Sequence, residues 1–228
     1  MTSADWQKVI YGLVAGWVLA QFTSYVLWRW KAERVKKLLS EELYDLHKQV
    51  YRILVGCQRA LQASGACVIE PSSTIAISNP IFRAYYKDAV LHLPSSKRVM
   101  YQLIHGHIDK LNDFIAMADR ANQVARDEFA ENGAGKKFLK AAEDFKALTS
   151  TCYVQCWMLD WHIRYQLSSR DPDLDVGTSK HKEYVDMLVQ ASNKAGAFVE
   201  QGRGMTPSQF EFPSQSDAFV GGFPQKGE

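Results

Sequence analysis

Residues 9–28 read VIYGLVAGWVLAQFTSYVLW, twenty consecutive residues without a charged side chain. As an α-helix this stretch is about 30 Å long, which matches the hydrocarbon thickness of a bilayer. Three tryptophans flank it, Trp6 on one side and Trp28 and Trp30 on the other. Indole rings favour the boundary between membrane and water. The stretch therefore predicts a membrane-spanning helix.

A cleaved signal peptide is the alternative for an apolar stretch near the N-terminus. Signal peptides carry a basic first region, an apolar core of about 7–15 residues and a cleavage site made of small residues. Here Asp5 offsets Lys8, the apolar run is longer, and it ends at the bulky residues Trp28 and Arg29. We therefore expect residues 1–30 to remain in the protein as a single-pass anchor.

Basic residues are concentrated on the C-terminal side of the apolar stretch. Only Glu33 opposes the five that lie there, which are Arg29, Lys31, Arg34, Lys36 and Lys37. Basic flanks stay in the cytoplasm, so we expect the N-terminus outside and the chain from residue 31 onward at the cytoplasmic face of the inner (plasma) membrane. The cluster is typical of a stop-transfer flank, and it also suits anionic lipid headgroups.

Small residues recur at every fourth position of the apolar stretch, namely Gly12, Gly16, Ala20 and Ser24. This spacing places them on one helix face, where the backbone of a second helix can approach closely. Two interpretations remain open. The face associates with another helix, which would make a homo-oligomer when the second helix is a copy of this chain, or it contacts only lipid.

The chain directly after the anchor shows helical periodicity. Its apolar positions follow steps of three and four: Val35, Leu39, Leu43, Leu46, Val50, Ile53, Cys57 and Ala60 or Leu61. This stripe predicts a juxtamembrane amphipathic helix over residues 31–65. The stripe alone does not distinguish a dimeric coiled coil from the first helix of a bundle. A bundle is favoured because further helices follow.

Four further helices are predicted from periodicity and from start and stop signals: Pro80 to about Leu91, Lys97 to about Glu131, Lys136 to about Ser169, and about Ser179 to Val199. The two long ones are joined by a glycine turn and predict an antiparallel hairpin. Asn79 is expected to cap the first of the four, and Ile75 and Ile77 alternate like a short extended piece. The predicted fold class is all-α, with a helical bundle over residues 66–200.

The composition changes in residues 201–228, which contain five Gly and three Pro. Such a segment buries too little apolar surface to fold alone, so it is predicted to be a disordered tail. It also contains four spaced phenylalanines, which suit a groove on a partner protein: Phe210, Phe212, Phe219 and Phe223. Packing of the tail against its own bundle is the other open interpretation.

One set of residues suggests a metal site. Cys152 and Cys156 lie four positions apart on one predicted helix, so their thiols share a face, and His105 and His107 lie on the helix expected opposite. Together they would form a Cys2His2 zinc site. The spacing differs from that of ordinary zinc fingers, and buried cysteine often packs as a small apolar residue. We expect core packing, with no metal and no cofactor.

Composition and motifs narrow the classes of function. A net charge of +2 with scattered basic residues does not indicate a nucleic-acid platform. The chain contains no G-x-S-x-G, H-E-x-x-H or dinucleotide-binding motif. We therefore expect a non-enzymatic, single-pass membrane protein that binds partner proteins, as an adaptor, an assembly factor or an exclusion or immunity factor such as those of plasmids and phages. The alternative is a membrane-tethered metalloprotein or enzyme that uses the Cys/His set.

Overall fold

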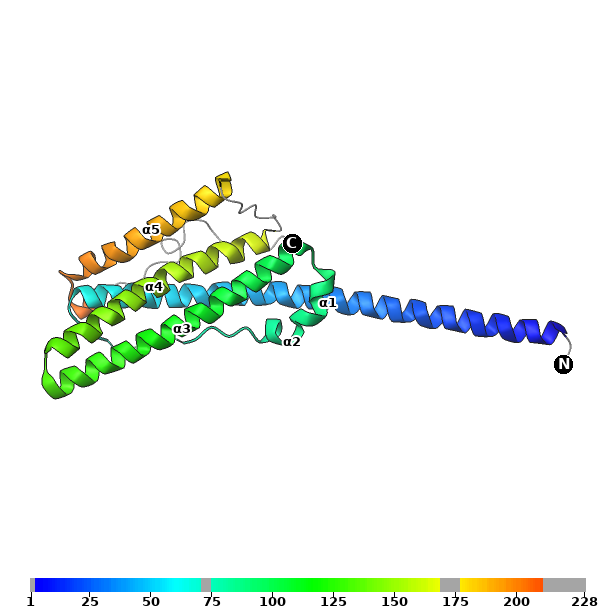
Figure 1. Ribbon diagram of the computed structural model, residues 1–228, viewed down its shortest axis with the longest axis horizontal. Helices are drawn as coiled ribbons and strands as arrows, with labels where there is room; N and C mark the ends of the chain where they lie inside the picture. Colours follow the sequence, from blue (N-terminus) through cyan, green and yellow to red (C-terminus); the bar gives the residue numbers. More distant parts are fainter. Residues whose placement is uncertain (1–2, 71–74, 169–176, 211–228) are drawn as a thin grey trace. The chain divides into compact units, whose positions relative to one another are not determined.

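The computed structural model describes residues 3–70, 75–168 and 177–210, and this part of the chain is helical without any strand. The elements are α1 (Ser3–Gly65), α2 (Pro80–Ala89), η1 (Val90–His92), α3 (Ser95–Asn132), α4 (Lys136–Leu167), α5 (Ser179–Gly202) and η2 (Pro207–Gln209) (Figure 1). They form two units, Met1–Glu42 with Pro80–Leu93 and Leu43–Asn79 with Pro94–Glu228. The all-α fold is confirmed.

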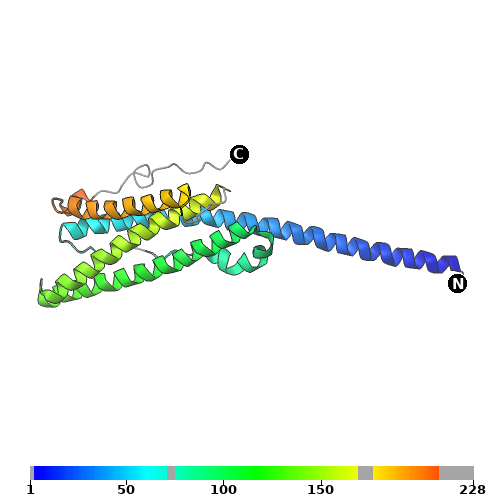
Figure 2. The same ribbon diagram turned by 45° about the horizontal axis from the view of Figure 1, so that its top comes forward.

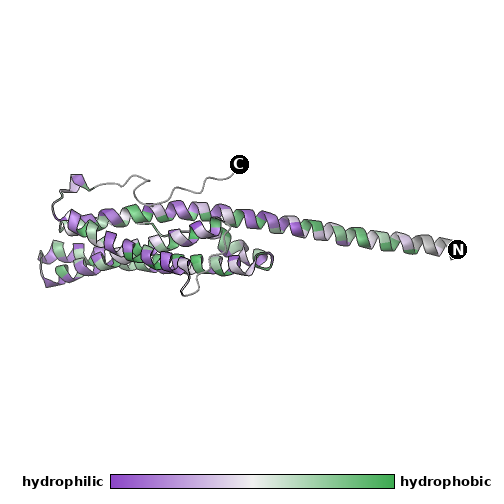
Figure 3. Cartoon of the chain, turned by 90° about the horizontal axis from the view of Figure 1, so that it is seen from above, coloured by the Kyte–Doolittle hydropathy of each residue, from purple (hydrophilic) through white to green (hydrophobic). Residues whose placement is uncertain are grey.

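Helix α1 is continuous over 63 residues. The boundary predicted between the anchor and the amphipathic helix, at residues 30 and 31, does not interrupt it. The physical reason is local: the sequence RWKAERVKK at residues 29–37 has no glycine or proline and consists mostly of good helix formers. Figure 3 shows apolar residues along the N-terminal part of α1 and a mixed pattern after it. The same helix therefore contains the apolar segment and the amphipathic stripe.

The amphipathic stripe of α1 is buried as predicted. Each of its members is at most 5% exposed: Val35, Leu39, Leu43, Leu46, Val50, Ile53, Cys57 and Leu61. The stripe packs within the same chain, which confirms the bundle interpretation for the described residues. Two contacts to other helices come from its C-terminal half, where His47 meets Asp160 of α4 and Gln62 donates to Gln201 of α5.

Helices α3 and α4 lie antiparallel and side by side, joined by a turn at Gly133–Gly135 (Figures 1 and 2). Gly133 has a φ of +68°, a conformation that glycine adopts without strain. The facing sides of the two helices are buried and mostly apolar, with Ile104, Ile108, Leu111 and Ile115 on α3 and Phe145, Cys152, Leu159 and Ile163 on α4. The predicted hairpin thus buries the stripe of each helix.

The first unit contains α2, whose start is held by a buried glutamate of α1. Glu42 accepts hydrogen bonds from the backbone N–H groups of Ile81 (2.7 Å) and Phe82 (2.9 Å). A carboxylate at a helix N-terminus is favourable because it satisfies donors that the helix itself leaves unpaired. Helix α2 begins at Pro80, as predicted, but the side-chain amide of Asn79 donates to His105 Nδ1 at 2.7 Å, and Glu42 accepts from the first N–H groups of the helix.

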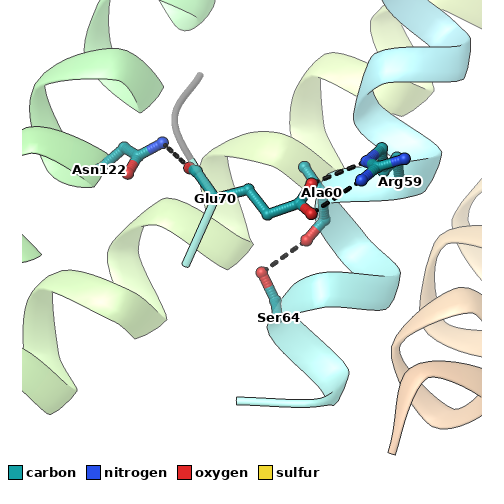
Figure 4. A network of polar contacts seen from close by, with 5 residues as sticks. All are labelled: Arg59, Ala60, Ser64, Glu70 and Asn122. Carbon is teal, nitrogen blue, oxygen red and sulfur yellow. Dashed lines mark hydrogen bonds and ion pairs between the residues drawn. The ribbon is translucent and has the colours of Figure 1, made fainter. Parts of the chain in front are cut away.

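The segment that follows α1 is fastened by a small polar network (Figure 4). The guanidinium of Arg59 donates two hydrogen bonds to the carboxylate of Glu70, at 2.7 and 2.8 Å. The backbone carbonyl of Glu70 accepts from the side chain of Asn122 on α3 at 2.9 Å. Ser64 satisfies its hydroxyl locally by donating to the carbonyl of Ala60. Residues 66–70 are thereby tied to both α1 and α3.

The start of the predicted disordered tail is ordered. Helix α5 extends to Gly202, and Thr206 and Gln209 form a capping box around η2. Phe210 is 4% exposed, and the guanidinium of Arg59 lies 5.9 Å from the centroid of its ring. The prediction of disorder is wrong for residues 201–210, because Phe210 gains a buried site on its own bundle. Phe212, Phe219 and Phe223 lie outside the described residues.

Helices α1 and α5 approach closely at a pair of glycines. A Cβ atom added to Gly202 would collide with the backbone carbonyl of Gln62, and one added to Gly65 would collide with the carbonyl of Val199. Both collisions involve backbone atoms, which cannot rotate away. Close contact between the C-terminal ends of α1 and α5 therefore requires glycine at both positions.

We expect Gly202→Ala to destabilise the protein by about 1–3 kcal/mol, because overpacking against backbone forces the two helices apart. Gly196→Ala is the matched control, since it lies on the same helix and its Cβ would meet no atom within 4 Å. The control is expected to gain up to about 1 kcal/mol from helix propensity. Thermal unfolding of the full chain in detergent micelles, followed by circular dichroism, measures both. If the two variants have the same thermal stability, the close approach of α1 and α5 at Gly202 is contradicted.

Candidate functional sites: an apolar segment and a buried polar network

The N-terminal part of α1 exposes large apolar side chains on all its faces. Each of the following is at least 45% exposed: Trp6, Ile10, Tyr11, Leu13, Val14, Trp17, Val18, Leu19, Phe22, Tyr25, Val26, Leu27, Trp28 and Trp30. The helix is long and apolar enough to cross a membrane. The hydroxyl of Thr23 is satisfied within the helix, because it donates to the carbonyl of Leu19 at 2.9 Å. An exposed apolar surface of this extent is typical of contact with lipid or with another helix.

The small residues of the apolar segment form an open face. Cβ atoms added to Gly12 and Gly16 would meet no atom within 4 Å, and Ala20 and Ser24 are exposed. The described residues of the chain therefore leave the whole face uncovered. Its geometry permits a second helix to pack there, and the homotypic or heterotypic contact predicted from the spacing stays a prediction.

The basic flank of the apolar segment is arranged by local contacts. Arg29 donates to the hydroxyl of Tyr25, and the guanidinium of Arg34 lies 5.8 Å from the centroid of the Trp30 ring. The three lysines each meet a carboxylate of the first unit: Lys31 with Asp88, Lys36 with Glu33 and Lys37 with Glu41. These are surface pairs, which contribute little to stability. At the end of the charge-free run, one arginine thus bonds a tyrosine hydroxyl and the other lies over a tryptophan ring.

A second site, which the sequence analysis missed, is buried in the bundle. Asp160 of α4 is completely buried and lies between two cationic or ionisable groups. Its Oδ1 atom is 2.8 Å from Nδ1 of His47 on α1, and its Oδ2 atom is 2.6 Å from a guanidinium nitrogen of Arg164 on α4. The carboxylate therefore contacts side chains of two helices, α1 and α4. The side chains of His47 and Asp160 are 6% and 0% exposed, so their contact lies in the interior of the bundle.

The four residues considered for zinc lie in separate settings. His105 is bonded to Asn79, whereas His107 stacks on His162 of α4 with 5.4 Å between ring centroids. Cys152 and Cys156 both interact with Cys57 of α1. Within residues 3–70, 75–168 and 177–210, no group of three metal-binding side chains has the geometry for an ion. The Cys2His2 arrangement is therefore not assembled there.

The cysteine cluster behaves as part of the core. Cys57, Cys152 and Cys156 are each at most 5% exposed. The hydrogen bond with Cys57, followed by burial, raises the pKa of the Cys152 thiol well above its usual range. Metal binding and nucleophilic attack both need a thiolate, and this environment favours the neutral thiol. The apolar stripe of α1 predicted Cys57 on the buried face, whereas its contact with the two cysteines of α4 was not predicted.

The stacked histidines give the bundle a defined response to acid. Burial, and next the proximity of His107, lowers the pKa of His162 from 6.5 to about 4. The folded state therefore holds His162 neutral, whereas the unfolded state binds a proton at higher pH. Its contribution to stability is complete above the unfolded value and is lost as the pH falls from about 6.5 towards 4.

We expect His162→Phe to remove this part of the acid sensitivity, which amounts to at most about 3 kcal/mol. The measurement is the free energy of unfolding of the full chain at several pH values between neutral and acid. His181→Phe on α5 is the control for replacing a histidine of the bundle with phenylalanine. If the wild type and His162→Phe lose stability in parallel between pH 6.5 and 4, His162 is not the group that titrates.

Comparisons of the chain with protein families, with curated proteins and with solved structures find no match. Its function is therefore inferred from the residues and their geometry.

Proposed function

We propose that this protein is a single-pass membrane protein whose helical bundle binds a partner protein at the cytoplasmic face of the membrane. The observation that carries the proposal is the continuity of α1. One helix contains an exposed apolar segment as long as a bilayer is thick and, further along, a stripe that is buried in the bundle. In this proposal α1 tethers the bundle to the membrane.

The chemistry of the interior supports a role as an adaptor, an assembly factor or an exclusion factor. The side chains of His47 and Arg164 contact the buried carboxylate of Asp160, and a hydrogen bond with Cys57 together with burial raises the pKa of the Cys152 thiol. These arrangements stabilise a scaffold. Function then depends on surfaces, as it does in proteins that recruit or block other proteins.

The hairpin offers one such surface. A shallow groove of about 680 Å³ lies between α3 and α4, lined by Met117, Arg120, Ala121, Asp144, Ala147, Leu148 and Thr151. Met117 is 45% exposed in this groove, and its flexible thioether adapts to different partner surfaces. An apolar floor flanked by an arginine and an aspartate suits a partner helix with both apolar and charged side chains.

Site-specific photocrosslinking in the native membrane tests the proposal. With the crosslinker at Met117 of the full chain, we expect one discrete adduct with another protein. Lys182, exposed on α5, is the control position and should give none. Ala147→Arg fills the groove from an exposed position and should abolish the adduct while the helical content is unchanged. An adduct that persists in Ala147→Arg, or no adduct at Met117, would contradict partner binding in this groove.

Self-association through the apolar segment is examined by the same experiment. Replacing Gly12 and Gly16 with leucine removes the close approach that a second helix requires. If Met117 crosslinks to a second copy of this chain, and this adduct disappears in the Gly12→Leu/Gly16→Leu variant, the chain forms a homo-oligomer through α1. If it is a different protein and remains, the groove recruits that protein independently of the open face.

A further inference from the structure

The short helix α2 and the turn η1 run back along α1 towards the apolar segment. Three contacts within the first unit define their course. Glu42 holds the start of α2, the carboxylate of Asp88 lies 3.4 Å from Nζ of Lys31, and the ring of His92 meets the ring of Trp28 at 4.3 Å between centroids. As the chain proceeds from α2 to η1, its contacts on α1 therefore move from Glu42 to Trp28.

Simple helix geometry agrees with this course. The fourteen residues from Trp28 to Glu42 span about 21 Å of helix, and the eleven residues from Ile81 to His92 span about 17 Å. An antiparallel arrangement of the two segments fits both lengths. It places the C-terminal end of η1 level with Trp28, the last residue of the charge-free stretch.

The residue at that level is unusually exposed for its chemistry. Leu91 is 81% exposed, although its neighbours Val90 and His92 are partly covered and Leu93 is buried. Trp28 is itself exposed and belongs to the type of residue found at the boundary between membrane and water. A leucine level with Trp28 lies beside the apolar segment of α1. Lipid around that segment can bury the leucine side chain without a protein partner.

Other exposed residues of the first unit suit the polar layer of a membrane. On α2, Tyr85 is 45% exposed and Lys87 is exposed, and Arg29 of α1 lies one residue beyond Trp28. Tyrosine combines an apolar ring with a hydroxyl that remains in water, and basic side chains attract anionic headgroups. The occupant that matches both the apolar and the charged residues is the lipid surface, continuous with the lipid around α1.

We propose that η1 and the exposed face of α2 form a second membrane contact, in which Leu91 inserts into the bilayer just below the headgroups and Lys87 meets lipid phosphates. This inference rests on the proposed crossing of the membrane by α1. With α1 as one contact and Leu91 as another, the first unit is held at a fixed depth and rotation relative to the bilayer.

Fluorescence quenching by brominated lipids tests this contact in the full chain. Cys67 is exposed, whereas the other three cysteines are buried, so a Cys67→Ser background accepts a single bimane label. The label is placed through Leu91→Cys, through Leu19→Cys in the apolar segment, or through Leu139→Cys, a control leucine on α4 that is 59% exposed. The chain is reconstituted in nanodiscs of phosphatidylcholine brominated close to the headgroup or deep in the acyl chain.

We expect lipids brominated close to the headgroup to quench the label at position 91, lipids brominated deep in the chain to quench the label at position 19, and neither to quench the label at position 139. Adding phosphatidylserine should increase the quenching at position 91, and Lys87→Glu should remove that increase. Quenching at 19 with none at 91 overturns the second contact but leaves the anchor in place. Absence of quenching at 19 overturns the anchor, and the second contact with it. The proposal is also overturned if another protein shields the label at position 91 in native membranes and the same label is not quenched in nanodiscs.

Discussion

A chain with Val18→Arg and Leu19→Arg is expected to lose its integration into the membrane. Both residues lie at the centre of the charge-free stretch, where each arginine costs about 2.5–3.5 kcal/mol in insertion experiments. The two changes together oppose insertion by about 5–7 kcal/mol. Membrane fractionation after an alkaline carbonate wash is the measurement: the wild-type chain should remain in the pellet and the variant should leave it.

The control for this prediction is a second pair of arginines on the bundle. Val185 and Val189 of α5 are 41% and 54% exposed, so Val185→Arg/Val189→Arg adds the same charge at the surface of the helical domain. This variant should stay in the pellet like the wild type. If both double variants behave alike, the apolar segment of α1 does not hold the protein in the membrane.

The second large effect is expected at Asp160. Replacing it with asparagine removes the buried charge that offsets Arg164 and orients His47, and breaking a buried ion pair on one side typically costs about 3–5 kcal/mol. Denaturant unfolding of the full chain in detergent micelles measures the loss. Asp144→Asn, at an exposed position on the same helix, is the matched control and should change stability by less than about 0.5 kcal/mol.

An apolar replacement of the whole network tests whether the network itself stabilises the fold, or whether Asp160→Asn is costly only because it leaves its partners uncompensated. In His47→Leu/Asp160→Leu/Arg164→Met no charge remains to be desolvated, so much of the stability lost in Asp160→Asn should return. Recovery would show that the cost of the single change comes from uncompensated partners. A triple variant that is less stable than Asp160→Asn would show instead that the network itself contributes net stability.

Much of the fold was predictable because it depends on local patterns. The spacing of Leu39, Leu46 and Val50 along α1 identified the buried face, and the glycine turn at Gly133 located the hairpin. Periodicity and capping signals act over one or two helical turns, so a single sequence contains them. The observed ends of α3, α4 and α5 lie within three residues of the predicted ones.

The polar contacts were not predictable in the same way, because their partners are distant in the sequence. Glu42 caps a helix that begins 38 residues later, and the side chain of Asn112 both donates to and accepts from the backbone of Ile77, as a neighbouring strand would. The extended piece predicted at Ile77 therefore has a side chain as its partner. Only Asp160 left a trace in the sequence, as a carboxylate beside an apolar stripe with Arg164 four residues later.

Side-specific labelling of sealed membrane vesicles tests most directly whether α1 carries the chain across a bilayer. Cys67, the exposed cysteine that follows α1, reports one side, and Ser3→Cys in a Cys67→Ser background reports the other. With a membrane-impermeant maleimide, position 67 should react only when the cytoplasmic face is turned outward, and position 3 only in the opposite orientation. Reaction of both positions from the same side would contradict the crossing. If position 3 reacts from the cytoplasmic side and position 67 from the other side, the chain crosses the membrane but the proposed topology is wrong.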